Sequence, residues 1–182
     1  MTGTRRVIVG TSGSPGSLRA LRYAEDVAST RSAVLIPVLA WVPPGGDRAD
    51  RLQPSGYLRH EWQEAACQRL RDALIAVWGR IPDDPSVRPV VRRGEPGRVL
   101  LEIACGPDDL LVVGAGRRGT LARITRSGKV SRYCLAHARC PVLALPPPAL
   151  AQEAGHLRLA WKFWSRTLTP DSVLRDHGRA PA

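Results

Sequence analysis

The sequence has no long hydrophobic run: none approaches the ~18 apolar residues from which a membrane-spanning helix is read. The amino terminus leads from two arginines directly into a strand-like run, without the apolar region and cleavage site of a signal peptide. Apolar residues make up 43% of the 182 positions and charged residues 24%, which is ordinary for a globular domain. These features predict a cytoplasmic protein without a membrane span.

Cysteine and histidine are few and scattered. The four cysteines contain no C-x-x-C pair and no zinc-type spacing. His137 precedes Cys140 by three positions, a spacing that two metal ligands can use, but one such pair leaves a coordination sphere incomplete. We therefore expect free thiols and no metal cluster.

Acidic residues are absent between Asp109 and Glu153. The whole chain has 27 Lys and Arg against 16 Asp and Glu, a net charge of +11, and residues 114–140 hold seven of the cations. Such a segment forms either a solvated basic face or a surface that attracts anions. No aromatic residues that could stack on bases are interleaved with these arginines, so we do not expect specific nucleic-acid binding.

Strand-like and helix-like patterns alternate along the chain. Short apolar runs predict strands at residues 6–11, 33–41, 86–94, 109–115 and 141–145, and helical spacing predicts helices at residues 15–29, 57–78, 95–105 and 129–138. The composition of residues 42–56 predicts a loop. Pro37 interrupts the second strand, where we expect a local bulge, and a proline in the third strand predicts an edge position.

This alternation predicts an α/β fold, because strands joined by helical crossovers run parallel. We expect a doubly wound, Rossmann-like five-stranded parallel sheet with helices on both faces, over residues 1–148. Residues 149–182 carry apolar side chains three or four positions apart and predict an amphipathic helical C-terminal tail. The tail would dock on the domain or a second copy, lie on a membrane surface, or stay disordered until a partner binds.

Gly114, Gly116 and Gly119 form a literal G-x-G-x-x-G after the fourth predicted strand. A dinucleotide fingerprint belongs in the first βα turn, with a helix at the last glycine and an acid about 20 residues on. None of these conditions holds here. A Walker loop requires Ser or Thr after its lysine, whereas Lys129 is followed by Val130. The glycines therefore predict neither of these phosphate sites.

Three stretches together resemble the universal stress protein family. They are VIVGTSGSPGSLRALRYAEDVA at residues 7–28, LLVVGAGRRG at residues 110–119, and SGKVSRYCLAHARCPVLAL at residues 127–145. The resemblance covers about residues 5–146, and HARCPVL at residues 137–143 is its most specific mark. It implies an adenine nucleotide alpha hydrolase-like fold, ATP at the carboxyl ends of the strands, a phosphate-binding G-x2-G-x9-G-[S/T] stretch after the fourth strand, and a homodimer paired through the last strand.

On the nucleoside side, the resemblance implies four candidate residues: Thr11, Ser12, Ala40 and Trp41. The family's first-loop acid, which contacts the nucleoside, falls on Ser12, and Trp41 falls where a residue after the second strand borders the base. A hydrogen bond to a charged group is worth ~1.5 to 3 kcal/mol, so the missing acid predicts weaker nucleoside selectivity.

On the phosphate side, Gly114 matches the first motif glycine, but the second falls on Arg117. Gly128 matches the last glycine only with one extra loop residue, and the hydroxyl residue after it is Lys129. The candidate phosphate-binding residues are Gly114, Gly116, Arg117, Gly119, Gly128, Lys129, Val130 and Ser131. Glycine amides and a helix start can bind phosphate, while Arg117 could clamp a phosphate or fill the pocket.

The sequence thus predicts a universal stress-type regulatory protein that binds ATP or another phosphorylated ligand weakly. The alternative is a ligand-free relative with a degenerate nucleotide site, acting as a dimeric interaction scaffold. No carboxylate or histidine is placed near the glycine segment to orient a water molecule. We therefore expect a binding module rather than an enzyme, with weak ATP hydrolysis left open.

Overall fold

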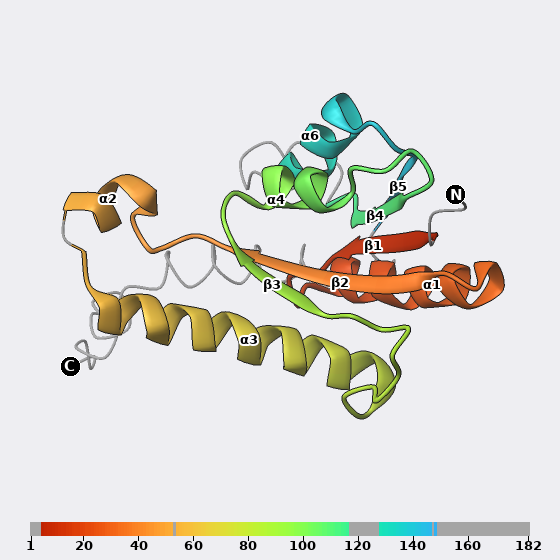
Figure 1. The fold of residues 1–182 in the computed structure, drawn as a ribbon, viewed down its shortest axis with the longest axis horizontal. Coiled ribbons are helices and arrows are strands. Elements are labelled where there is room, and N and C mark those ends of the chain that lie inside the picture. Colours follow the sequence, from red (N-terminus) through yellow and green to blue (C-terminus); the bar gives the residue numbers. More distant parts are fainter. Residues whose placement is uncertain (1–4, 53, 117–127, 147, 149–182) are drawn as a thin grey trace, which may run out of the picture. The chain divides into compact units, whose positions relative to one another are not determined.

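The computed structural model describes residues 5–52, 54–116, 128–146 and 148 of the chain. Strands and helices alternate over most of this length (Figure 1). The strands are β1 (Arg6–Gly10), β2 (Val34–Trp41), β3 (Val90–Arg93), β4 (Leu110–Gly114) and β5 (Val142–Leu145). The helices are α1 (Pro15–Arg31), α2 (Gly46–Leu52), α3 (Gly56–Trp78), α4 (Pro96–Ile103) and α6 (Lys129–His137).

All neighbouring strands are parallel, and their order in the sheet is β3-β2-β1-β4-β5. The chain starts in the middle at β1, moves outward through β2 to β3, and then crosses to β4 and β5 on the other side. This reversal of direction is what makes an open α/β sheet doubly wound. The predicted fold class is therefore confirmed for the described residues.

Two apolar cores lie on the two faces of the sheet. Successive β1 residues alternate between them: Val7 and Val9 belong to one core and Ile8 to the other. The first core joins the sheet to α1 and α3, and the second joins it to α4 and α6. Because both faces are covered, the central strands β1, β2 and β4 are apolar apart from Arg6 at the start of β1.

The predicted signals at the helix ends are confirmed. Ser14 caps α1, its side chain accepting a hydrogen bond from the N–H of Ser17, and Pro15 is the first helical residue. α3 ends at Gly79, whose φ of +70° places it in the left-handed region that favours glycine. The first turns of α3 are less buried than the rest of the helix. Leu58, at the third position of α3, is 43% exposed, and Figure 1 shows these turns extending past the strands.

Pro37 lies in a regular strand, so the expected bulge is wrong. Val9 pairs with Pro37 in an uninterrupted register. On the other side of β2, Leu35 pairs with Val87 and Val38 with Val90, so Pro37 lies opposite Pro89. The nitrogen of Pro37 faces β3, as does that of Leu35 two residues earlier, whose N–H donates to the Ser86 carbonyl at 2.8 Å. Pro37 therefore costs the β1–β2 ladder no hydrogen bond.

The prediction of a loop over residues 42–56 is also wrong, because α2 forms within it. Asp47 in its first turn and Arg51 in its last turn both suit the helix dipole. The buried side chain of α2 is an acid, Asp50, and the apolar Leu52 is 76% exposed. Composition could not predict this helix, since its stabilising partners lie elsewhere in the chain.

The predicted tail at residues 149–182 lies outside the described residues, and its boundary and helical character stay predictions. Within the described ranges, no helix combines the length and apolar character needed to cross a membrane.

Candidate functional site

The carboxyl ends of the parallel strands meet at one edge of the sheet, which is where open α/β sheets bind ligands. The structure places most of the predicted site residues at this edge, which we call the carboxyl edge. These are Thr11 and Ser12 after β1, Ala40 and Trp41 at the end of β2, Gly114 and Gly116 at the end of β4, and Gly128, Lys129, Val130 and Ser131 at the start of α6. Arg117 and Gly119 lie outside the described residues.

Gly114 brings the end of β4 against the first turn of α1. A Cβ atom at this position would lie 3.1 Å from the carbonyl carbon of Gly16 and 3.3 Å from the nitrogen of Ser17. These neighbours are backbone atoms, which cannot swing away as a flexible side chain can. A side chain here would thus separate the glycine segment from the loop after β1.

Gly128 is required for two reasons. Its φ is +77°, and a Cβ atom would lie only 2.7 Å from the carbonyl oxygen of Ala115. The Ser131 hydroxyl donates to the Gly128 carbonyl at 3.0 Å and also lies 3.4 Å from the Ala115 carbonyl. Ser131 is 3% exposed, so it fixes the start of α6 beside the chain leaving β4 rather than facing a ligand.

The start of α6 carries two features that attract an anion. The residue at the cap position is Gly128, which has no side chain that could cap the first turn. Lys129 is exposed at the first helical position. The positive end of the helix dipole and a nearby ammonium group both favour a bound anion at this place.

The loop after β1 is closed by hydrogen bonds among serines. The N–H of Ser12 donates to the Ser17 hydroxyl at 3.2 Å, and the hydroxyls of Ser12 and Ser14 lie 3.0 Å apart. The Ser17 hydroxyl in turn donates to the Ser14 carbonyl at 2.9 Å. Thr11 is buried and continues the β1–β2 ladder. The position of the family's acid therefore holds a neutral hydroxyl that is already engaged.

The S-x-S-x-x-S spacing of Ser12, Ser14 and Ser17 was the available sequence signal for this network. Sequence reasoning identified the cap at Ser14 but did not find the role of Ser17.

Trp41 lies beneath the surface of this edge. The residue is 6% exposed and packs in the core shared with α1 and α3. The guanidinium carbon of Arg93, its partner on β3, lies 5.9 Å from the centroid of the ring. The Trp41 carbonyl accepts a hydrogen bond from the N–H of Gly94 at 2.8 Å. The indole thus offers no open face for stacking in this conformation.

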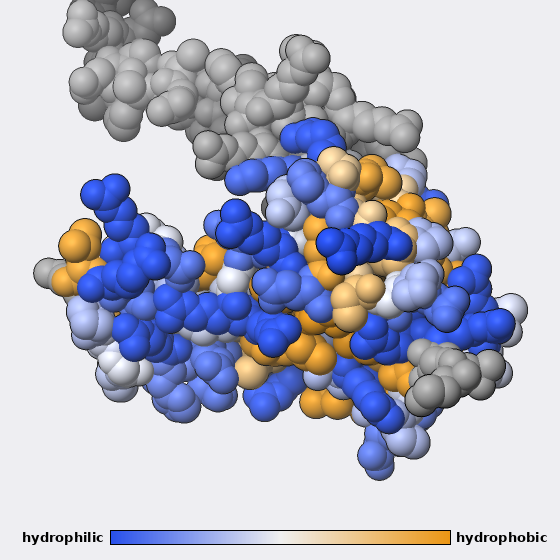
Figure 2. Space-filling model, turned by 45° about the horizontal axis from the view of Figure 1, so that its top comes forward, coloured by the Kyte–Doolittle hydropathy of each residue, from blue (hydrophilic) through white to orange (hydrophobic). Residues whose placement is uncertain are grey.

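An ion cluster connects α2 to α3 and β3. The Asp50 carboxylate accepts hydrogen bonds from Nε of Arg59 at 3.0 Å and from Nη2 of Arg93 at 2.9 Å, and the same Nη2 donates to Asp47 at 2.7 Å. Burial by itself would raise the pKa of Asp50, but hydrogen bonds from the two guanidinium groups bring that pKa below its ordinary value. In Figure 2 the lobe at the left, where α2 lies, is mostly hydrophilic, with apolar atoms at its outer end.

Sequence reasoning missed this cluster. Asp47 and Asp50 are three residues apart, which places both carboxylates on one face of a helix. That signal could be used only if the segment had been recognised as helical.

All four cysteines, each within the described ranges, are free thiols. Burial raises the pKa of Cys134 to about 11 and also raises the pKa of Cys140. Among the described residues, no three His, Cys, Asp or Glu side chains are grouped as metal ligands would be.

A family model described as the universal stress protein family matches residues 3–146. A universal stress protein of Mycolicibacterium smegmatis is 32% identical over 141 residues, which are 78% of this chain and 45% of that protein. Universal stress protein Rv2005c of Mycobacterium tuberculosis is 35% identical over 137 residues, 75% of this chain and 44% of that protein. The chain thus spans about half the length of the curated relatives it matches.

Two solved structures share the architecture. UspA from Lactobacillus plantarum superimposes with a TM-score of 0.56 at 21% identity, covering 78% of this chain and 97% of that one. The protein MJ0577 superimposes with a TM-score of 0.59 at 15% identity, covering 79% and 96%. At these identities the likeness concerns the fold, and it agrees with the parallel five-stranded sheet described above.

Proposed function

The chain belongs to the universal stress protein family, and from this premise we propose that it is a regulatory protein that binds ATP or another phosphorylated ligand weakly at the carboxyl edge. The observation that carries the proposal is the start of α6, where Gly128 at a φ of +77° lies against the Ala115 carbonyl and, being glycine, supplies no capping side chain. A helix start with glycine at the cap position beside a lysine is a favourable place for a phosphate group.

Close backbone contact supports the same phosphate site. At both Gly114 and Gly128 a Cβ atom would collide with backbone atoms of a neighbouring segment. These are the two positions that match the family's first and last motif glycines. Glycine is therefore required by backbone packing at both ends of the loop that joins them, which supports a phosphate site there.

The residues at the nucleoside positions offer weaker contacts than those at the phosphate positions, which is why we propose low affinity. Ser12 replaces a charged acceptor and is already hydrogen-bonded to Ser14 and Ser17. Loss of a hydrogen bond to a charged group costs ~1.5 to 3 kcal/mol, or about 10- to 100-fold in affinity. Trp41 is buried beneath Arg93. We therefore expect phosphate groups to contribute more to binding than the base.

Isothermal titration of the full chain with ATP and with inorganic pyrophosphate tests the proposal. We expect both ligands to bind in the millimolar range, with only a small preference for ATP. Gly128→Ala should abolish the signal. Gly79→Ala, which has a similar φ of +70° with open space around it and caps α3, should leave binding unchanged. Absence of heat with both ligands at millimolar concentration would overturn the proposal.

We propose a binding module rather than an enzyme. The carboxylates of Asp47 and Asp50, which lie on α2 beyond the end of β2, are engaged by arginines and are not available as bases. We expect no ATP turnover above the uncatalysed rate. Turnover that disappears in Arg117→Ala would contradict this part of the proposal.

We also propose a homodimer paired through β5, acting in the cytoplasm. β5 is an edge strand of apolar residues that are only half-buried in the single chain, and four free thiols suit a reducing compartment. The engaged serines of the first loop favour a second candidate, the ligand-free dimeric scaffold. A chain that dimerises but gives no heat with either ligand would favour that scaffold.

Truncation after Pro148 removes the predicted tail and distinguishes two possible roles for it. If the shortened chain stays soluble and dimeric, the tail is free for another partner. If it aggregates, the tail covers apolar surface.

A further inference from the structure

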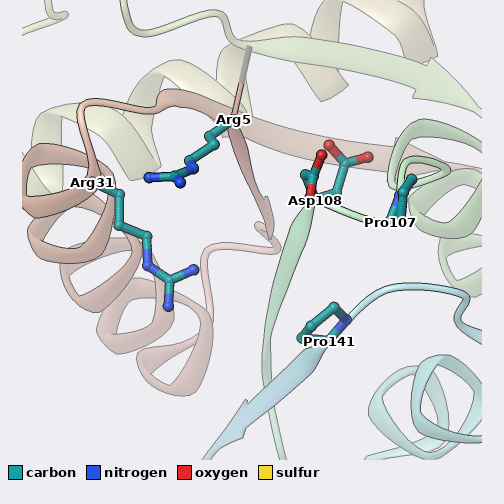
Figure 3. A pocket seen from close by; sticks show the side chains of 6 residues that line it. Arg5, Arg31, Pro107, Asp108 and Pro141 are labelled. Carbon is teal, nitrogen blue, oxygen red and sulfur yellow. The ribbon is translucent and has the colours of Figure 1, made fainter. Parts of the chain in front are cut away.

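A hollow of about 410 Å³ opens at the opposite edge of the sheet, beside the amino ends of β1, β4 and β5 (Figure 3). It is lined by Arg5, Arg31, Pro107, Asp108, Asp109 and Pro141. We call it the amino-edge hollow. Its volume is within the ~300 to 1,000 Å³ typical of small-molecule sites.

On one wall of the hollow, the Asp109 carboxylate is held in place and its charge is neutralised by Arg6. Asp109 is 4% exposed and accepts hydrogen bonds from Nε of Arg6 at 2.8 Å and from Nη2 of Arg6 at 2.5 Å. It also accepts from the N–H of Gly106 at 2.8 Å. This paired carboxylate adds little net charge to the space that it borders, and Pro107 and Pro141 stiffen the neighbouring backbone.

The other charged side chains around the hollow have no partner within the described part of the chain. Figure 3 shows the guanidinium groups of Arg5 and Arg31 on one side of the space and Asp108 on the other. All three residues are exposed, and none of their side chains forms a hydrogen bond or ion pair with a described residue. The two cations therefore face the hollow without an acid between them.

Backbone hydrogen bonds hold both arginines near the start of β2. The Arg5 carbonyl accepts a hydrogen bond from the N–H of Val34 at 2.9 Å. Arg31 ends α1 and is followed by Ser32, which takes a φ of +50° and donates its N–H back to the last turn. Two neighbouring like charges repel each other, and an anion placed between them removes that repulsion.

We propose that the amino-edge hollow binds a small zwitterion, with a phosphate or carboxylate between Arg5 and Arg31 and an ammonium group toward Asp108. A guanidinium group donates two parallel hydrogen bonds to either kind of anion. The carboxylate across the hollow selects a ligand whose other end is positive. This site lies at the edge opposite the proposed nucleotide site and does not depend on it.

Titration of the full chain with phosphoethanolamine and with β-alanine tests the proposal and distinguishes the two anions. At least one should bind more tightly than inorganic phosphate or ethanolamine. Arg31→Ala should weaken that binding about tenfold, the effect of losing one hydrogen bond to a charged group. Asp108→Asn should weaken it by a similar factor while leaving inorganic phosphate unchanged.

Matched controls lie on the segment between α3 and β3. Arg80→Ala and Asp83→Asn change exposed residues of the same types outside the hollow, and neither should alter binding. Gly128→Ala should also leave it unchanged, which separates this site from the carboxyl edge. Failure of both zwitterions to bind at millimolar concentration, or an Arg31→Ala effect no larger than that of Arg80→Ala, would overturn the proposal. Binding that is insensitive to Asp108→Asn would refute the zwitterion assignment.

Discussion

At the scale of single residues, Gly128 is the position where a small change should have the largest effect. Gly128→Ala combines a positive φ, which costs ~1 to 2 kcal/mol, with a collision with the Ala115 carbonyl worth a further ~1 to 3 kcal/mol. Gly79→Ala pays only the first cost, because nothing lies within 4 Å of its Cβ position. Urea unfolding should show the larger loss of unfolding free energy for Gly128→Ala, and equal losses would contradict the contact.

The cysteines should divide into two classes in a thiol-reactivity assay. Cys105 is exposed and Cys67 half-buried, whereas Cys134 and Cys140 are buried with raised pKa values. At pH 8, Cys105 of the native chain should therefore react rapidly with a disulfide reagent and Cys67 more slowly. Cys134 and Cys140 should react only after unfolding. Cys105→Ser should remove the fast phase, and a fast phase that survives this change would be inconsistent with the burial pattern.

The buried thiol of Cys134 also predicts that the stability of the folded chain falls at alkaline pH. Its pKa rises from 9.0 to about 11 on folding, so the unfolded chain loses this proton first. The contribution of the thiol to stability should be complete below pH 9 and fall as the pH rises toward 11. Cys134→Ala, compared with the parent by urea unfolding at pH 8 and pH 10, should reduce this decline.

At the scale of elements, α2 should depend on the ion cluster more than on apolar packing. Asp50→Asn removes the charge that Arg59 and Arg93 share, so residues 46–52 should exchange their amide hydrogens faster while the core of α3 stays protected. Asp72→Asn is the control, since Asp72 is an exposed acid on α3 that accepts a hydrogen bond from Gln68 and forms no ion pair with a described residue. Equal protection of α2 in both variants would contradict the role of Asp50.

The stability of α2 should also decrease at acid pH. The pKa of Asp50 lies below 3.8 in the folded chain, so its stabilising contribution is present above that pH and is lost as the pH falls through the lowered value. Exchange of residues 46–52 should therefore accelerate below about pH 4 in the parent chain, and Asp50→Asn should lack this step.

Elements built from local patterns could be predicted from the sequence, and those built from distant partners could not. The strands and the helices α1, α3, α4 and α6 were predicted because apolar periodicity and caps such as Ser14 are local signals. α2 was missed because Asp50 pairs with Arg59 and Arg93 from other elements. The carboxyl edge was located through Gly114 and Gly128, but the burial of Trp41 beneath Arg93 depends on the pairing of β2 with β3, which no local pattern shows.

At the scale of the whole molecule, the proposed dimer can be tested at one backbone N–H. The Ala115 N–H donates to the Leu145 carbonyl, so odd-numbered residues of β5 face β4 and the N–H of Ala144 faces outward. Ala144→Pro should leave the fold intact and convert a dimer to a monomer in sedimentation velocity. Leu143→Pro, in contrast, should lower thermal stability because its N–H faces β4. A dimeric Ala144→Pro chain would place the interface elsewhere.

The other outer strand of the sheet, β3, differs from β5 in its backbone donors, and this difference affects how copies of the molecule can associate. Because the N–H of Arg88 donates inward to the Leu35 carbonyl, the nitrogen of Pro89 points outward, where it offers no donor to an incoming strand. Arg92 is exposed beside it and adds charge. An open polymer built by strand addition needs both outer strands of the sheet, and Pro89 removes one outward donor just before β3. The proposed pairing through β5 would therefore favour a closed two-fold pair over an open polymer.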